Sequence, residues 1–236
     1  MKCAMSNVVQ QQGAAARSRD LSRDKVIRAG LDLMDRGGAA AVTMRSVGES
    51  LGVSPMALYN HVSSKHDLMR AIAAHVLDST EFSAGATDWR GQVTHCARVL
   101  RALCLRHPGL ARLLEMADMA PASVVKPMEV TLRALRKAGM SQTDGLRTYF
   151  TLVGFILVQA SYQCRGPYPG LEPSACIRSE PVAGRGCEMP EEADLPRQWD
   201  FDAAFEFGLQ LILDGVEAAV RRAKARPVDK IGEDNT

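Results

Sequence analysis

The segment 43–61 limits the possible folds of this chain more than any other, because it predicts two short helices joined by one tight turn. Val47 and Leu51 are four residues apart, so both apolar side chains lie on one face of the first helix. Gly52 follows, and glycine can leave a helix with a positive φ without a Cβ clash. Ser54 is a suitable N-cap for a second helix, and the proline after it suits the first helical position. The segment therefore predicts a helix-turn-helix, which presents its second helix to DNA bases.

The same pattern also fits a pair of packed helices that never touches nucleic acid, since short helix pairs with a glycine turn are common. The polar residues around the pair favour the DNA-binding alternative. Thr43 would cap the first helix and can donate to a phosphate, and Arg45 follows two residues later. Tyr59, His61 and Lys65 gather where the second helix ends and the next begins. Hydrogen-bond donors at helix ends are the groups with which proteins contact DNA phosphates.

Two short strings within this region carry a resemblance to a known family: Leu-Gly-Val-Ser at 51–54 and Leu-Tyr-Asn-His-Val at 58–62. Together with Lys65 and the helical run after it, they resemble the DNA-binding domain of the TetR family of bacterial transcriptional regulators. The resemblance extends upstream through residues 26–34, whose apolar side chains recur at helical spacing and would support the helix pair. The Leu-Tyr-x-His-Val element is typical of the tetracycline-repressor branch.

The composition and the resemblance together predict an all-α protein. Aromatic residues make up only 5% of the chain, and few alternating β-branched segments occur. We expect a flexible arm (1–19), a three-helix helix-turn-helix domain (20–66), a helical regulatory domain for ligand binding and dimerisation (67–225), and a polar tail (226–236). Within the regulatory domain, the Pro- and Gly-rich segment 165–197 is predicted to be a long loop.

The charge of the chain is nearly balanced, with a formal net charge of +2. Residues 1–78 contain ten Lys and Arg against seven Asp and Glu, so a small basic excess falls on the proposed DNA-binding half. The start of the chain lacks the apolar run of a signal peptide, and the longest apolar stretch, 152–160, is too short to span a membrane. The six cysteines show no Cys-x-x-Cys spacing. These features predict a cytoplasmic protein without membrane association.

The resemblance implies roles for individual residues at the DNA. Arg45 stands where an arginine can pair with O6 and N7 of a guanine. Met56 and Ala57 could contact thymine methyl groups, and Asn60 could meet an adenine or a phosphate. The predicted DNA-binding set is Thr43, Arg45, Ser54, Pro55, Met56, Ala57, Tyr59, Asn60, His61 and Lys65. One such helix reads few base pairs, so we expect a homodimer on a palindromic operator in double-stranded DNA.

The last two predicted helices, 145–163 and 201–225, are expected to form the dimer interface. Residues 205–217 resemble the last helix of the tetracycline-repressor branch, which dimerises through a bundle of its last long helices. A stripe at helical spacing is the candidate dimer face: Phe205, Gly208, Leu209, Ile212, Val216, Ala219 and Val220. The alternative is that this stripe only covers the core of its own subunit.

The regulatory half departs from the residues that bind a tetracycline–magnesium chelate. Near the corresponding places stand Glu81, Cys96, Leu114 and Phe155, which are not the histidines and asparagine of the tetracycline repressors. We therefore expect no metal and no cofactor, and an apolar or amphipathic small molecule as effector. The predicted ligand-binding set is Leu100, Leu103, Leu114, Met119, Phe150, Phe155, Gln159 and Tyr162.

Two other functional classes are alternatives to a ligand-responsive repressor. An enzyme is disfavoured because the chain contains no Gly-x-Ser-x-Gly, no phosphate-cradling glycine loop and no His-x-x-x-His pair, and no catalytic residue is predicted. The remaining alternative is a thiol- or metal-responsive DNA-binding regulator that uses Cys96, Cys104 and Cys164.

Overall fold

The structure is a computed structural model that describes residues 21–83, 85, 88–115, 124–165 and 200–225. Its helices are α2 (Arg23–Ala41), α3 (Met44–Leu51), α4 (Pro55–Leu58), α5 (Lys65–Asp78), α6 (Trp89–Arg106), α7 (Pro108–Glu115), α8 (Val125–Ala138), α9 (Gln142–Arg165) and α11 (Phe201–Ala225). The described residues include no strand. The predicted all-α fold is confirmed. The arm, the tail, the 165–197 loop beyond its first residue, and Met119 lie outside the described residues.

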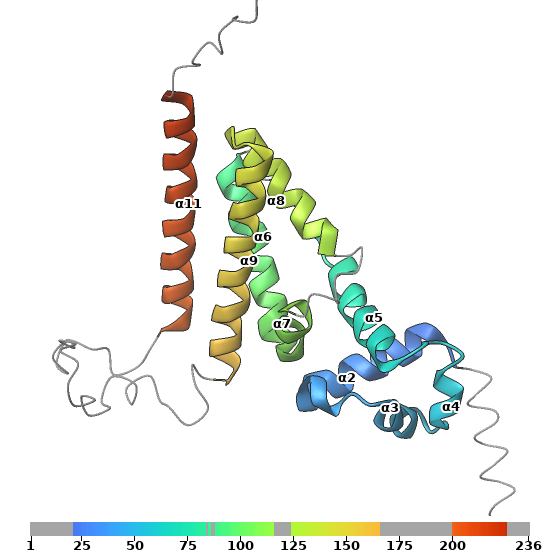
Figure 1. Cartoon of the computed structure of the whole chain (residues 1–236). Coiled ribbons are helices and arrows are strands. Elements are labelled where there is room, and N and C mark those ends of the chain that lie inside the picture. The colour runs from blue at the N-terminus through green and yellow to red at the C-terminus, as the bar shows by residue number, and fades with distance from the viewer. Residues whose placement is uncertain (1–20, 84, 86–87, 116–123, 166–199, 226–236) are drawn as a thin grey trace, which may run out of the picture.

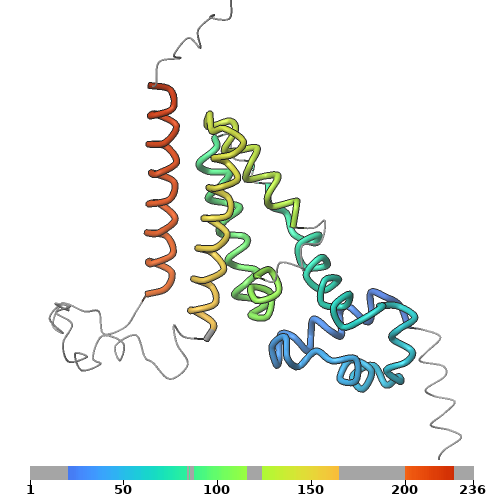
Figure 2. The backbone as a smooth tube through the Cα atoms, in the orientation of Figure 1, coloured from blue at the N-terminus to red at the C-terminus, as the bar shows by residue number. Residues whose placement is uncertain are grey.

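The helices are arranged from a small N-terminal group to a pair of long helices at the opposite edge (Figure 1). Helices α2, α3 and α4 form one end, and α5 leads from them towards the rest of the molecule. Helices α6, α8 and α9 pack against one another, and α7 packs against α2, α5 and α9. Helix α11 stands alongside α9 at the far edge, as the backbone trace also shows (Figure 2). The regulatory helices are therefore linked to the N-terminal group through α5 and α7.

The helix-turn-helix forms for the local reasons that the sequence predicts. The Thr43 side chain accepts from the backbone N–H of Ser46, whose own side chain accepts from the backbone N–H of Thr43, which completes a capping box at the start of α3. Gly52 ends α3 with φ 64°, in the left-handed region. Ser54 caps α4 by accepting from the Ala57 N–H. Helix α4 is a single turn, so its exposed side chains are presented close to this cap.

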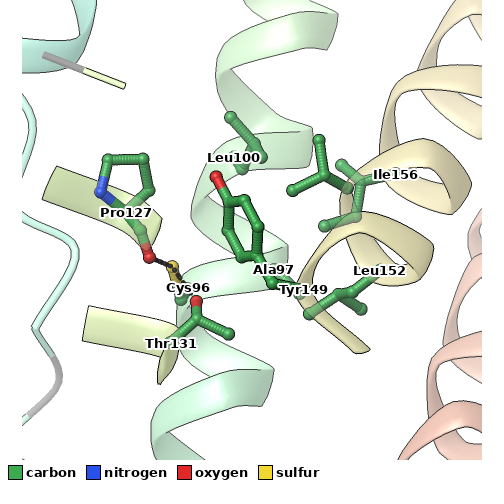
Figure 3. Close-up of a pocket in the computed structure, with 9 residues that line it drawn as sticks. Cys96, Ala97, Leu100, Pro127, Thr131, Tyr149, Leu152 and Ile156 are labelled. Carbon is green, nitrogen blue, oxygen red and sulfur yellow. Dashed lines mark hydrogen bonds between the residues drawn. The ribbon is translucent and has the colours of Figure 1, made fainter. Parts of the chain in front are cut away.

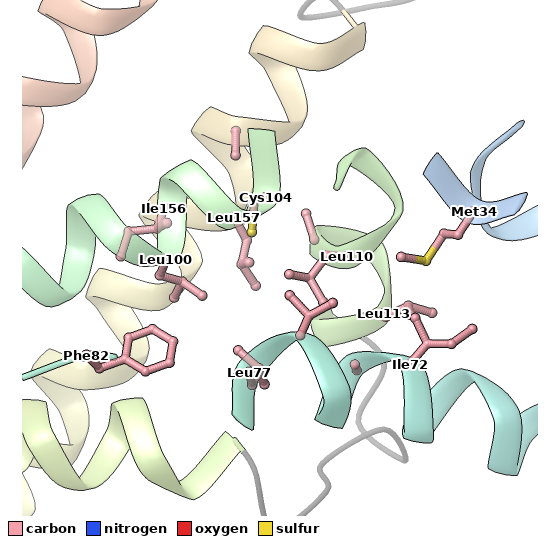
Figure 4. Packing of buried hydrophobic residues seen from close by; sticks show 14 of the residues in the cluster. Met34, Ile72, Leu77, Phe82, Leu100, Cys104, Leu110, Leu113, Ile156 and Leu157 are labelled. Carbon is pink, nitrogen blue, oxygen red and sulfur yellow. The ribbon is translucent and has the colours of Figure 1, made fainter. Parts of the chain in front are cut away.

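Helix α6 ends where the Pro108–Gly109 pair interrupts it, and this corner contacts the N-terminal group. A carboxylate of Asp35 on α2 lies 2.9 Å from Nδ1 of His107, the residue that follows α6. Gly109 lies so close to Met34 that an added Cβ would be 2.4 Å from its Cγ. One continuous apolar core crosses this corner and joins the two halves, as the packing around Met34, Leu110 and Leu113 shows (Figure 4).

Helix α11 is attached to the regulatory core by apolar and charged contacts. The Phe155 and Phe205 rings stack with centroids 5.5 Å apart, and a Cβ on Gly208 would be 2.6 Å from the Phe155 ring. Three arginines of α6 reach acidic side chains along α11: Arg90 to Asp214 and Glu217, Arg98 to Glu206, and Arg101 to Asp202. Helix α11 is therefore positioned by the same helix that precedes the corner at His107.

The predicted dimer stripe on α11 is corrected by this packing. Four of its members, Phe205, Leu209, Val216 and Val220, are buried within their own subunit. Gly208 approaches Phe155 of the same subunit instead of presenting an open face. The stripe thus covers its own core, which was the alternative interpretation of the sequence pattern. Phe207 and Leu211, which the pattern did not single out, are the large apolar side chains of α11 that remain exposed.

Candidate DNA-binding surface and effector cavity

The surface around α4 presents most of the predicted DNA-binding side chains to solvent. Met56 is 74% exposed and Tyr59 is 48% exposed, whereas Leu58 between them is fully buried and anchors the turn. Asn60 and Lys65 are also exposed, and Ala57 is half-buried. The arrangement leaves a large apolar side chain, Met56, in water beside polar groups. Such exposure suits contact with base edges and is unfavourable for a helix that only packs a core.

Arg45 lies on α3 in an ion pair with Glu49, one helical turn further on. Its Nε donates to a carboxylate oxygen of Glu49 at 2.8 Å, and both side chains are mostly exposed, at 84% and 64%. The hydrogen bond and the charge of Glu49 raise the pKa of Arg45. The guanidinium therefore lies on the surface with a partner that it can exchange for a base or a phosphate.

Arg23 holds the turn between α4 and α5, a role that the sequence pattern did not reveal. Its guanidinium donates to the backbone carbonyl of His61 and, at 3.1 Å, to Asp67. Asp67 also accepts from the backbone N–H of Ser63 at 2.9 Å. The hydrogen bond from the Ser63 N–H, and next in size the one from the Arg23 guanidinium, hold the pKa of Asp67 below its usual range. This network fixes the chain that follows Tyr59, because it joins Arg23 on α2 to His61 and Ser63 in the turn and to Asp67 on α5.

A cavity lies between α6, α8 and α9 in the regulatory half (Figure 3). Its empty volume is about 210 Å³, part of which is open to solvent. Nine residues line it: Cys96, Ala97, Leu100, Pro127, Thr131, Tyr149, Leu152, Val153 and Ile156. None of these side chains is charged at neutral pH, so the walls favour apolar and uncharged groups.

The predicted ligand-binding residues are dispersed by the structure. Leu100 lines the cavity between α6, α8 and α9. Phe150 is 66% exposed on the outer side of α9, and Phe155 faces α11. The other described members of the set, Leu103, Leu114, Gln159 and Tyr162, are half-buried and do not line this cavity. The sequence reasoning missed Tyr149 and Thr131, whose side chains do line it.

The three cysteines of the thiol-responsive alternative differ in their exposure to solvent. Cys96 and Cys104 are buried, and burial raises the pKa of both thiols, that of Cys104 to about 12. Cys164 is exposed, and its Sγ lies 3.9 Å from the carbonyl oxygen of Cys104. Across the ranges that the structure describes, no three His, Cys, Asp or Glu side chains are grouped to hold a metal ion. No described helix is long and apolar enough to cross a membrane.

A capped helix-turn-helix with an exposed second helix, joined to a larger helical domain, is the architecture of a DNA-binding regulator. Residues 83–220 match the family model described as the tetracyclin repressor-like C-terminal domain, and residues 26–72 match that of the bacterial regulatory proteins of the tetR family. The chain belongs to the TetR family of bacterial transcriptional regulators. The predicted resemblance is confirmed.

Three known proteins illustrate the similarity. The class A tetracycline repressor from transposon 1721 of Escherichia coli is 31% identical over 217 residues, which cover 89% of this chain and 95% of the repressor. The structure of the TetR family protein ActR of Streptomyces coelicolor with (S)-DNPA has a TM-score of 0.66 at 25% identity and covers 84% of this chain and 98% of ActR. The structure of BioQ with its double-stranded DNA operator has a TM-score of 0.62 at 27% identity and covers 84% and 99% of the two chains.

Proposed function

We propose that this protein is a transcriptional repressor that binds a palindromic operator as a homodimer and is released by a small apolar or amphipathic effector. The observation that carries the proposal is the single-turn helix α4, which exposes Met56 and Tyr59 while Leu58 anchors it in the core. The similarity to a tetracycline repressor, to an operator-bound regulator and to a ligand-bound one supports the same assignment. Binding to double-stranded DNA agrees with the predicted cytoplasmic location.

The roles at the DNA follow from exposure and chemistry. Arg45 is the candidate for reading a guanine, because it is exposed, and its bond to Glu49 can be exchanged for two bonds to a base. Met56 would contact thymine methyl groups. Tyr59, Lys65 and the capped end of α3 at Thr43 would contact phosphates and set the position of α4 in the groove.

The proposed dimer interface is the outer face of α9 and α11. Large apolar side chains are exposed on both helices: Phe150 (66%), Val158 (45%), Phe207 (68%) and Leu211 (56%). Gly154 and Gly215 have open space where a Cβ would point, which would let helices of a second copy approach closely. The exposure of aromatic and aliphatic side chains on two neighbouring helices supports this face as the proposed interface between subunits.

The effect of a ligand in the cavity would reach the DNA-binding helices through α6 and α7, and the operator would then be released. Helix α6 lines the cavity at Leu100 and ends at His107, which is paired with Asp35 of the DNA-binding half. A ligand that separates α6 from α9 would shift this corner and α7, which packs on α2 and α5. A change in the spacing of the two α4 helices in the dimer needs only a few kcal/mol of differential ligand affinity to empty the operator.

The thiol-responsive alternative is weaker because its buried members are poor nucleophiles. A thiol reacts as its thiolate, and burial of Cys96 and Cys104 disfavours that form. Only Cys164 of the three is exposed. The described cysteines therefore fit a structural role better than a sensing one.

The proposed function is tested by selecting DNA from a random duplex library with the purified full-length chain. We expect an inverted repeat whose half-sites are about one helical turn apart, bound with an affinity that falls steeply as salt rises. A scrambled duplex of the same composition is the control. Failure to enrich any inverted repeat, or equal binding of the selected and scrambled duplexes, would contradict the proposal.

A further inference from the structure

We propose that Arg23 is a positioning residue for DNA binding, which holds the turn 59–64 between α4 and α5 in the arrangement that DNA meets. The inference deepens the proposed function and rests on it, because it assigns a role at the operator to a residue outside the predicted DNA-binding set. The observation that carries it is a guanidinium on α2 that bonds this turn and the first turn of α5 at once.

The turn 59–64 contributes a single side chain, that of Val62, to the buried core. Its other five residues are exposed or half-buried. Helix α4, which precedes the turn, has only four residues, and a helix this short is not stable by itself. The position of α4 therefore depends in part on what holds its two ends. Ser54 caps the first end, and the turn follows the second.

The contacts of Arg23 and Asp67 hold the turn. One nitrogen of the Arg23 guanidinium donates to the backbone carbonyl of His61, and the other donates to Asp67 at 3.1 Å. The second carboxylate oxygen of Asp67 accepts from the backbone N–H of Ser63 at 2.9 Å and from its hydroxyl at 3.3 Å. Ser64 caps α5 by accepting from the Asp67 N–H at 3.0 Å. A turn that is ordered in this way before DNA arrives does not have to be ordered at the expense of binding.

Arg23 also balances the charge of Asp67 beside the DNA. The hydrogen bonds from the Ser63 N–H and from Arg23 lower the pKa of Asp67, so its carboxylate is ionised at neutral pH. Asp67 lies two residues after Lys65, the proposed phosphate contact, and an unpaired carboxylate there would repel phosphates. The side chains of Arg23 and Asp67 are 50% and 31% exposed, so salt weakens this effect of charge. Salt does not remove the effect on the position of the turn.

The first measurement is hydrogen exchange of the full chain without DNA, followed by mass spectrometry of peptides that cover the turn. Arg23→Gln should raise the exchange rate of the turn about two- to tenfold, the range for the loss of one hydrogen bond. Arg23→Lys should raise it as well, because an ammonium lacks the planar fork that bonds two acceptors at once. Arg28→Gln is the matched control, since it removes the same charge from α2, from a pair with Asp24 of the same helix. It should leave the exchange of the turn unchanged.

The second measurement is the affinity of the same variants for the selected and scrambled duplexes. Arg23→Lys should weaken binding to the selected duplex about two- to tenfold and leave binding to the scrambled one nearly unchanged, because it alters position and keeps the charge. Arg23→Gln should weaken binding to both. Adding Asp67→Asn to Arg23→Gln should restore binding to the scrambled duplex, because the uncompensated carboxylate is gone. A purely structural role would instead lower the melting temperature without separating the two duplexes.

Three results would overturn the proposal. These are turn exchange at the wild-type rate in both Arg23 variants, equal losses on the two duplexes for Arg23→Lys, and a double variant that binds the scrambled duplex no better than Arg23→Gln. If the wild type prefers no inverted repeat, the proposed function fails instead. The exchange of the turn, measured without DNA, still decides whether Arg23 holds it.

Discussion

At the scale of single residues, the DNA-binding surface combines side chains that are locked with side chains that are not. Asp67 and Arg23 fix the turn after α4, whereas Met56 and Tyr59 stand in water. Arg45 is intermediate, because its partner Glu49 is itself exposed. An exposed ion pair of this kind contributes little stability, so breaking it to contact DNA costs little.

Arg45→Ala should weaken binding to the preferred operator by about 1–3 kcal/mol and relax its sequence preference, because a bidentate contact to a base is lost. Lys65→Ala should weaken binding to all duplexes alike and lower the salt slope by about one. Fluorescence anisotropy on selected and scrambled duplexes over a salt series measures both. Equal losses on the two duplexes for Arg45→Ala would assign Arg45 to a phosphate instead.

The cysteines provide a second prediction at this scale. A thiol with the pKa of about 12 given for Cys104 is thiolate in on the order of one molecule in ten thousand at pH 8. Iodoacetamide should therefore modify the exposed Cys164 well before Cys104 or Cys96, as followed by peptide mass spectrometry. The rate at Cys104 should rise with pH until the protein unfolds. Modification of Cys104 as fast as Cys164 in the folded protein would restore the thiol-responsive alternative.

At the scale of elements, the strength of local signals decides what the sequence could predict. The helix-turn-helix was predictable because Gly52, Ser54 and Pro55 act on their own neighbours. The cavity was not, because α9 is apolar on two faces. Tyr149 points inward and its neighbour Phe150 points outward, about 100° apart around the helix. Periodicity on such a helix cannot tell the core face from an outer one, since tertiary packing makes that choice.

The arginines of α6 give the prediction at this scale. The Arg101 side chain is 13% exposed, donates to Asp202 and Gln163, and lies 4.5 Å from the centre of the Phe205 ring. Arg101→Ala should therefore lower the free energy of unfolding by about 2–3 kcal/mol. The Arg98 side chain is 55% exposed in its pair with Glu206. Arg98→Ala should therefore lower the free energy of unfolding by about 1 kcal/mol or less.

Urea denaturation of the two variants at one protein concentration measures this difference. The comparison is matched, because both arginines lie on α6 and both pair with a carboxylate of α11. Equal losses would show that burial of the Arg101 guanidinium is not what attaches α11.

At the scale of the whole molecule, the exposed apolar face of α9 and α11 is the proposed dimer interface. Phe207→Glu together with Leu211→Glu should give a monomer in sedimentation velocity, because charges would be buried in the proposed interface. Operator affinity should fall at least about a hundredfold, since one half-site contact is lost. Val125→Glu, at a 48% exposed position on α8, is the matched control and should remain a dimer. A dimeric double variant would place the interface elsewhere.

The continuous core around Met34, Leu110 and Leu113 also governs how the protein unfolds. Family models divide the chain between residues 72 and 83, but the apolar packing crosses that division. Neither half can melt without exposing side chains that the other half covers. The subunit should therefore unfold as one cooperative unit. Calorimetry should show a single transition, and its enthalpy should include the unfolding of both halves. A ligand held in the regulatory half should then protect the helix-turn-helix half from heat, proteolysis and hydrogen exchange, without touching any of its residues.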